Sequence, residues 1–154
     1  MAAALTLEER LARIEALEAV RSVVSRYCVV IDHERTREAL APFFAEEAVL
    51  RNPAGLTTGR EAILDYYDGF FSSGVSVSRH HLANQRFTAL RDGRVRHEAY
   101  FLMLMARDGE SFVGFGDYDD VLAHDGDAWR FVEKANLVAA VVPLEEGWAA
   151  VAPP

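Results

Sequence analysis

The stretch RDGRVRHEAYFLMLMARDGESFVGFGDYDDVLAHDGD, residues 91–127, contains three Asp-Gly dipeptides, which begin at Asp92, Asp108 and Asp125. Long runs rich in β-branched and aromatic residues lie between and around them. Asp-Gly between such runs is a strong hairpin signal, because both residues tolerate a positive φ. The pattern predicts four antiparallel strands joined as a meander, near residues 76–91, 94–107, 111–124 and 127–142.

The chain before this meander reads as mainly helical. Residues 6–32 begin with a capping-box pattern, Thr6 and Glu9, and continue with apolar residues at helical spacing. This stripe consists of Leu7, Leu11, Ile14, Leu17, Val20, Val24, Tyr27 and Ile31. Residues 33–44 predict a short second helix, residues 46–52 a short strand, and residues 57–71 a third helix.

Helices that precede an antiparallel sheet define the α+β class. A sheet with strands this long must curl, and the three N-terminal helices must cover it. We therefore expect a cone with a closed apolar bottom and an open mouth. The chain of 154 residues suits one domain, residues 1–154, with its core at 7–142 and a loose or partner-docked tail at 143–154.

Composition and charge exclude several classes of partner. The 24 acidic and 16 basic residues give a net charge of −8, which argues against nucleic acid or an anionic membrane as partner. The sequence shows neither a signal-peptide pattern nor an apolar run of membrane-spanning length. The single cysteine, Cys28, allows no intrachain disulfide, which fits a reducing compartment. We expect a soluble cytoplasmic protein.

Asp32 and Tyr27 are the first polar candidates in apolar surroundings. Asp32 follows three apolar residues at the end of the first helix, and Tyr27 lies about 140° away around an ideal helix. The two side chains reach one cavity only if the helix end bends. The alternative is that Asp32 caps the next helix and Tyr27 is a core aromatic.

His80 and His81 are adjacent in the first long strand, so they point to opposite faces of the sheet. On this pattern, Asn84 shares the face of His80, whereas Phe87 shares the face of His81. For either histidine the alternative is a surface or hydrogen-bonded core role. Adjacent strand histidines cannot both bind one ion, and the sequence contains no Cys/His cluster, so no metal is expected.

Two further polar residues lie in later strands. His97 could reach the mouth of a cavity, or it could lie at an exposed strand end. Lys134 is unusual within a strand, although its long side chain could reach solvent at the rim. Neither a Gly-x-Ser-x-Gly motif nor a glycine-rich phosphate loop is present, and Cys28 has no evident activation. General acid/base chemistry by Asp, His and Tyr is the chemistry that remains.

The segments RYCVVIDHERTREALAPFFAEEAVL, TTGREAILDYY, RHHLANQRF and GFGDYDDVLAHDGDAWRFVEK resemble the SnoaL-like branch of the nuclear transport factor 2-like superfamily over about residues 7–142. Within that branch the chain is similar to scytalone dehydratase, bile acid 7α-dehydratase and hexachlorocyclohexane dehydrochlorinase. The resemblance implies a cone-shaped α+β barrel. In those enzymes an Asp near the end of the first helix pairs with a His on the first long strand, which assigns these positions to Asp32 and His80. The spacing from Asn84 and Phe87 selects His80 over His81.

The resemblance also implies roles for other residues. Tyr27 takes the place of a hydrogen-bonding aromatic residue that could act as an acid. Lys134 takes the place of a basic residue that steadies negative charge, and Asn84 would orient the substrate. Some relatives carry a second acid or histidine where this chain has Met103 or Met105. The expected lining for an apolar ring is Phe44, Tyr66, Phe70, Tyr100, Met103 and Phe115.

The implied function is a cofactor-independent lyase or dehydratase. It would act by Asp–His acid/base catalysis on a small cyclic, largely apolar hydroxy-ketone or a polycyclic substrate. One alternative is an isomerase or polyketide-type cyclase that uses the same pocket. Another is a binding or assembly domain without catalysis. A homodimer or homotrimer is expected, because a copy of the chain usually covers the open face of such a sheet.

Overall fold

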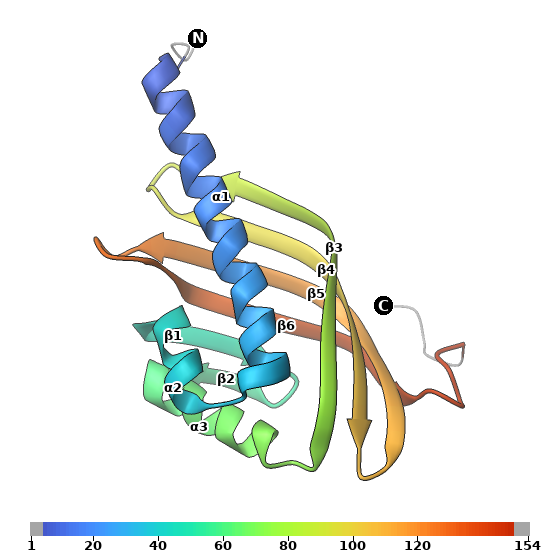
Figure 1. Ribbon diagram of the computed structural model, residues 1–154. Helices are drawn as coiled ribbons and strands as arrows, with labels where there is room; N and C mark the ends of the chain where they lie inside the picture. Colours follow the sequence, from blue (N-terminus) through green and yellow to red (C-terminus); the bar gives the residue numbers. More distant parts are fainter. Residues whose placement is uncertain (1–4, 150–154) are drawn as a thin grey trace.

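The computed structural model describes residues 5–149 (Figure 1). Its elements are, in order, α1 (Leu7–Val29), a π-helical turn η1 (Val30–Glu34), α2 (Arg37–Leu40), a 3₁₀ turn η2 (Ala41–Phe43), β1 (Phe44–Asn52), β2 (Gly55–Thr58), α3 (Arg60–Phe71), β3 (Val75–Ala89), β4 (Val95–Arg107), β5 (Glu110–His124) and β6 (Trp129–Pro143). The strands form one sheet in the order β2-β1-β6-β5-β4-β3. The expected α+β class is confirmed.

The predicted meander is present, with strand boundaries within two residues of the expected ones. The central Asp-Gly dipeptide forms a two-residue turn in which Asp108 has φ 53° and Gly109 has φ 84°. Two consecutive positive φ angles are the signature of a type I′ hairpin turn. The other two dipeptides lie within longer turns, where Gly93 and Gly126 alone adopt a positive φ.

The N-terminal part of the sheet differs from the prediction. Strand β1 runs parallel to β6, and β2 pairs with β1 as a short antiparallel strand. The sequence pattern missed β2, because Thr57 and Thr58 were read as the start of the third helix. That helix begins at Arg60, immediately after Gly59, which has φ 93°.

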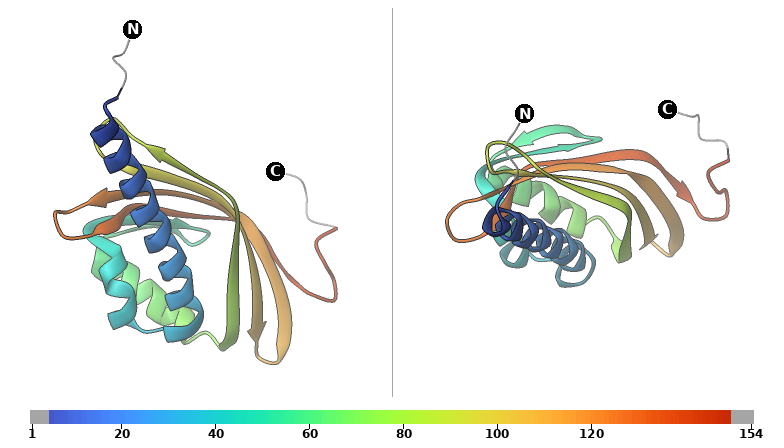
Figure 2. Two further views of the ribbon diagram at one scale, coloured as in Figure 1. Left: turned by 45° about the horizontal axis from the view of Figure 1, so that its top comes forward. Right: turned by 90° about the horizontal axis from the view of Figure 1, so that it is seen from above.

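The sheet curves strongly around the helices, which lie on its concave side (Figure 2). Register shifts mark β-bulges on β3 between Ala83 and Arg86 and in the β5/β6 pair. Bulges increase local twist and bend a strand. At Gly116 an added Cβ would lie 2.1 Å from the carbonyl oxygen of Leu137, so only glycine allows β5 and β6 to approach this closely.

An aromatic cluster closes the bottom of the cone. Tyr27 lies within 6.1–6.4 Å, between ring centroids, of Phe43, Phe44 and Tyr67, and within 5.2 Å of Phe131. All five side chains are buried. Edge-to-face contacts of this kind add to the free energy gained from area burial.

The first half of the apolar stripe on α1 is not buried. Leu7, Leu11 and Ile14 are 78%, 54% and 62% exposed, whereas Val20 and Val24 are in the core. The reason is visible in Figure 1, in which the N-terminal half of α1 extends beyond the sheet.

The start of the predicted tail is ordered against the sheet. Strand β6 extends to Pro143, and the Leu144 N–H donates to the carbonyl oxygen of Ser111 at 2.8 Å. Trp148 packs edge-on against Phe115. The remainder of the expected tail, residues 150–154, lies outside the described residues.

Candidate active site

Asp32 lies in the π-helical turn that follows α1. The Arg35 N–H donates to the carbonyl oxygen of Val30 at 2.9 Å, an i→i+5 bond that widens the helix. A widened turn rotates the residues after Val29 relative to an ideal helix. The local bend required for Asp32 and Tyr27 to serve one site is therefore present, and it brings Asp32 against β3.

Three hydrogen bonds hold the Asp32 carboxylate. Its Oδ1 accepts from the Ser78 hydroxyl at 2.6 Å and lies 2.7 Å from Nδ1 of His80. Its Oδ2 accepts from the His80 backbone N–H at 2.7 Å. Burial opposes ionisation of Asp32, but the bonds from His80 and Ser78 outweigh it and hold its pKa below the ordinary value.

This geometry fixes the tautomer of His80. An ionised carboxylate only accepts hydrogen bonds, so Nδ1 of His80 carries the hydrogen that points to Asp32. His80 is one of the residues that line the interior cavity, whereas its neighbour His81 is exposed. The arrangement therefore places a histidine ring, held through Nδ1 by a carboxylate, at the cavity wall.

The interior cavity has a volume of about 100 Å³. Its lining is mostly apolar and aromatic, with a few polar groups, as is typical of small-molecule sites. The lining residues are Tyr27, Ile31, Asn52, Pro53, Tyr66, Tyr67, Phe70, His80, Phe101, Met103, Tyr118, Asn136 and Val138. For scale, an engineered apolar cavity of about 150 Å³ binds benzene. The cavity, which is partly open to solvent, therefore suits one small ring.

Two tyrosines meet in the cavity wall. The hydroxyl oxygens of Tyr27 and Tyr67 are 2.5 Å apart. Burial raises the pKa of both, so both are neutral proton donors near neutral pH. Hydrogen bonds from Tyr27 and Asn136 oppose part of the rise at Tyr67. Either hydroxyl can donate in this pair; with Tyr27 as the donor, the proton of Tyr67 is available to the cavity.

The sequence interpretation gave Tyr67 no role in the site and missed this contact. Tyr66 and Tyr67 are neighbours on α3, and only Tyr66 was expected to face the pocket. Both line the cavity, together with Phe70 and Met103, as expected for the latter two. Phe44 does not line it, because it is fully buried in the aromatic cluster beneath.

Two predicted lining residues face the other side of the sheet. Tyr100 is 59% exposed, because it alternates with Phe101 and Met103, which point inward. Phe115 lies opposite Leu102 in the β4/β5 register and contacts Trp148 on the outer surface. The prediction assigned residues of both parities to one face, which a regular strand does not allow.

Asn84 is also outside the cavity. It is exposed, with φ 51°, at the bulge where the β3/β4 register shifts. The bulge changes the parity of β3, so Phe87 returns to the inner face and stacks on His97 at 4.8 Å. His80 and Phe87 therefore share a face, although regular alternation predicts opposite faces. The bulge follows His80 and leaves its orientation unchanged.

His97 and Lys134 belong to a buried polar network. His97 Nδ1 lies 2.9 Å from Oδ2 of Asp120, and Lys134 Nζ lies 3.0 Å from Oδ1 of the same carboxylate. The Lys134 ammonium also lies 3.4 Å from the centroid of the Tyr118 ring and 4.9 Å from that of Tyr27. All three network residues are buried. His97 is therefore not at an exposed strand end, and the Lys134 side chain does not reach solvent at the rim. Lys134 contacts the site only through the rings of Tyr118 and Tyr27, which line the cavity.

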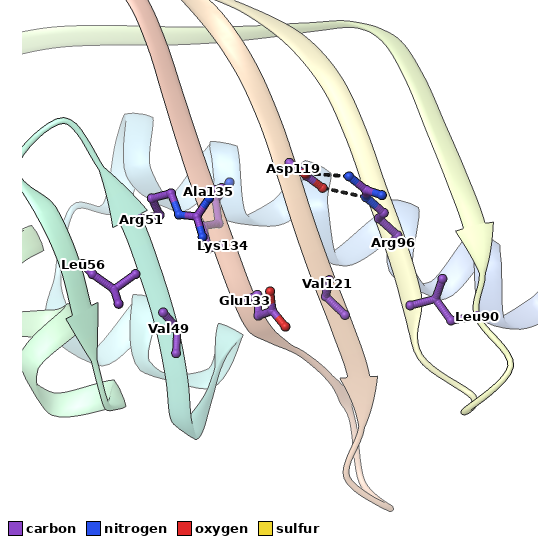
Figure 3. Close-up of a pocket in the computed structure, with 10 residues that line it drawn as sticks. All are labelled: Val49, Arg51, Leu56, Leu90, Arg96, Asp119, Val121, Glu133, Lys134 and Ala135. Carbon is purple, nitrogen blue, oxygen red and sulfur yellow. Dashed lines mark hydrogen bonds and ion pairs between the residues drawn. The ribbon is translucent and has the colours of Figure 1, made fainter.

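The outer face of the sheet carries a separate pocket of about 360 Å³ (Figure 3). Across its floor, the Arg96 guanidinium pairs with Asp119 through two contacts of 2.7 Å. Lys134 contributes to this wall, but its Nζ bonds Asp120. The pocket lacks an acid/base pair comparable to Asp32 and His80 among the residues that Figure 3 labels.

Other chemistry has weaker support. Within residues 5–149, His, Cys, Asp and Glu side chains form no group of three that could hold a metal ion. Cys28 is buried, and burial raises the pKa of its thiol to about 12, so it is a poor nucleophile. None of the helices in the described part of the chain has the length and apolar character needed to cross a membrane.

The fold and the site together define a class: an α+β cone with an Asp–His pair at a small apolar cavity. The family model described as SnoaL-like domain matches residues 12–135, and the chain belongs to this family. No curated protein matches the sequence.

Several solved structures share the fold. Hexachlorocyclohexane dehydrochlorinase LinA-type3 from Novosphingobium barchaimii LL02 has a TM-score of 0.77 and 19% identity over 94% of this chain and 99% of that one. A protein described as a candidate scytalone dehydratase, from Novosphingobium aromaticivorans DSM 12444, has a TM-score of 0.76 and 18% identity, with 84% of this chain and 88% of that one covered. At sequence identities of 18% and 19%, the structural similarity supports a shared fold and nothing further.

Proposed function

We propose that this protein is a cofactor-independent lyase that removes water from a small cyclic hydroxy-ketone. The observation that carries the proposal is the 2.7 Å contact between Asp32 Oδ1 and His80 Nδ1, with His80 on the wall of the cavity. Two structural neighbours, a dehydrochlorinase and a candidate scytalone dehydratase, are named for eliminations of the same general type.

In the proposed reaction His80 acts as the base. Its Nε2 takes a proton from the carbon next to the carbonyl, and Asp32 stabilises the imidazolium that forms. The C–H electron pair becomes a C=C bond while the C–O bond breaks. Tyr67, supported by Tyr27, donates a proton to the departing hydroxyl, which leaves as water. Transfer of the proton from His80 back to the tyrosinate restores the site. General acid/base catalysis of this kind contributes about 10²–10⁴-fold.

The cavity limits the size of the substrate. Its volume of about 100 Å³ favours a single ring over a polycyclic substrate within the enclosed part. Tyr66 and Phe70 are only partly buried, so a larger substrate would have to extend past them toward solvent. We expect the reacting carbon at His80 and the apolar ring against Phe101 and Met103.

The neighbouring histidines provide a matched test. A panel of cyclic hydroxy-ketones is incubated with wild type, His80→Ala and His81→Ala, and loss of water is read by mass spectrometry. We expect His80→Ala to lose about 10²-fold or more in kcat/KM, whereas His81→Ala retains activity. Activity that survives His80→Ala would reject the mechanism.

Isomerisation or cyclisation could use the same proton abstraction. The same mass measurement separates these reactions, because an isomerase changes retention time without a change in mass. A binding or assembly domain without chemistry predicts indifference to both histidine variants. The hydrogen-bonded Asp32–His80 pair at an interior cavity favours catalysis over this alternative.

We also infer a homo-oligomer, formed through the outer face of the sheet. Tyr100, Leu102, Leu104 and Val141 are each at least 40% exposed on β4 and β6. Strands β4 and β6 flank β5 in the sheet, and exposed large apolar side chains that gather on one face are typical of interaction surfaces. Light scattering of wild type and of Leu104→Asp tests this, since the variant should shift the protein to monomer. A cytoplasmic location remains a prediction.

A further inference from the structure

Two buried amide atoms in the cavity wall lack partners. Among the residues that the structure describes, Asn52 Nδ2 and Asn136 Oδ1 make no hydrogen bond, although both atoms are buried. Both residues line the same cavity as His80. Buried polar groups are nearly always satisfied, so an unpaired donor and an unpaired acceptor in one cavity point to a ligand or a water that completes them.

The hydrogen-bond pattern fixes which atom is which. Asn52 Oδ1 accepts from the Ala54 backbone N–H at 2.8 Å, so its amide nitrogen is the group that faces the cavity. The Asn136 amide lowers the pKa of Tyr67, as a hydrogen-bond donor does, and its carbonyl oxygen is the atom without a partner. One side of the cavity therefore offers one donor and one acceptor.

The two amides are neighbours in the sheet. Strands β1 and β6 pair in parallel with Arg51 opposite Ala135, and Asn52 and Asn136 are the next residues on each strand. Leu50 and Lys134, two residues earlier, form a pair whose side chains are buried on the inner face. Paired strands lie about 4.8 Å apart, close enough for one ligand atom to reach both amides.

A hydroxyl group is the simplest partner for this pair. Its oxygen can accept from Asn52 Nδ2 while its hydrogen is donated to Asn136 Oδ1. A halogen substituent can only accept, and it would face the lone pairs of the Asn136 oxygen. The chemistry of the pair therefore discriminates between a hydroxyl and a halogen of similar size.

We propose that Asn52 and Asn136 bind the hydroxyl that departs, beside Tyr67, and that they select hydroxylated over halogenated rings. Asn136 is bonded to Tyr67, so a hydroxyl held by the amides lies next to the proposed acid. The identity of this hydroxyl as the leaving group rests on the proposed function. Selection of a hydroxyl by the amides does not, because it is an equilibrium property of the cavity.

Equilibrium binding of phenol, toluene and chlorobenzene tests the proposal without any turnover. Dissociation constants are measured by NMR titration for wild type, Asn52→Leu and Asn136→Leu. We expect wild type to prefer phenol over both other ligands by about tenfold or more, the size of an unmade buried hydrogen bond. Asn136→Leu should abolish the preference over chlorobenzene, and Asn52→Leu should reduce affinity for phenol.

Three controls keep the test decisive. Asn84→Gly removes the third asparagine of the chain, which is exposed and has a positive φ, and should leave all three constants unchanged. Asn52→Asp retains the acceptor for Ala54 and exchanges the amide donor for an ionised carboxylate, which only accepts, so it replaces Asn52→Leu if that variant does not fold. His80→Ala should keep the phenol preference while it loses catalysis, which separates this proposal from the mechanism.

Two outcomes would overturn the proposal. One is a wild-type protein that binds phenol and chlorobenzene equally. The other is that Asn52→Leu and Asn136→Leu lower the melting temperature but leave the ligand preference intact. That second result would mean that the amides satisfy each other and serve the fold alone.

Discussion

Replacement of Lys134 by methionine should destabilise the protein strongly. Lys134 and Asp120 are both fully buried, with Nζ and Oδ1 3.0 Å apart. The variant keeps the volume of the side chain but leaves the carboxylate with His97 Nδ1 at 2.9 Å and the Ala135 N–H at 3.2 Å as its only donors. Removal of one partner of a buried ion pair costs about 3–5 kcal/mol.

This loss is large relative to the stability of a domain, which is about 5–15 kcal/mol. For a protein of this size 1 kcal/mol shifts the melting temperature by about 2–4 °C, so we expect a drop of about 6–20 °C. Circular dichroism during urea and thermal unfolding measures both quantities. Loss of the contact between Nζ and the Tyr118 ring, 3.4 Å from atom to centroid, acts in the same direction.

A double variant separates the ion pair from simple packing. Asp120→Leu combined with Lys134→Met removes both charges, and it should be more stable than Lys134→Met alone. The exposed pair of Arg86 and Glu98 serves as the reference, since solvent screens it and Arg86→Ala should change stability far less than Lys134→Met. A loss below about 1 kcal/mol for Lys134→Met, or strict additivity in the double variant, would refute the reasoning.

Three further predictions concern the site and the sheet. The low pKa of Asp32 contributes stability that is present above the ordinary pKa of 3.8 and is lost as the pH falls through the pKa of the folded state. The difference in unfolding free energy between wild type and Asp32→Asn should therefore shrink between pH 6 and pH 3, as measured by urea titrations. Tyr67→Phe should lower kcat more than Tyr27→Phe in the water-loss assay, because Tyr67 holds the proton that faces the cavity. Gly116→Ala should lower the melting temperature, since the added Cβ would lie 2.1 Å from the backbone of β6. Gly69→Ala is the control: its Cβ meets open space on α3, so the variant should be neutral or stabilising.

The regular parts of the fold could be predicted because local rules decide them. The capping box of Thr6 and Glu9 is formed as expected. The Asp108-Gly109 turn also fixes the β4/β5 register, since equal steps outward from it reach His97 on one strand and Asp120 on the other. Counting from this turn could have identified the buried His97–Asp120 pair, a signal that the sequence interpretation did not use.

Positions next to bulges could not be predicted in this way. Counting from Asp92-Gly93 as a two-residue turn would pair Ala89 with Arg96, whereas the structure pairs Ala89 with Val95, and the register shifts again between Arg86 and Ala83. A bulge depends on how the whole sheet curves over the helices, which is a tertiary property with no local sequence signature. The exposure of Asn84 and the inward position of Phe87 follow from this bulge. The outward position of Tyr100 does not, because simple alternation with Phe101 already requires it.

The Asp32–His80 contact depends on an irregular segment, and the irregularity is informative. In an ideal helix the side chains of Tyr27 and Asp32 would point about 140° apart. The π-helical turn at Val30–Glu34 rotates Asp32 against β3, where it contacts His80, while Tyr27 faces the cavity that His80 also lines. A π-helical turn is rare and occurs frequently at functional sites. The three hydrogen bonds that Asp32 accepts from Ser78 and His80 fix this turn against β3. A purely structural carboxylate could cap a helix without such a turn, and the pairing of the π-helical turn with a cavity-lining histidine is the physical reason to interpret the contact as a site of chemistry.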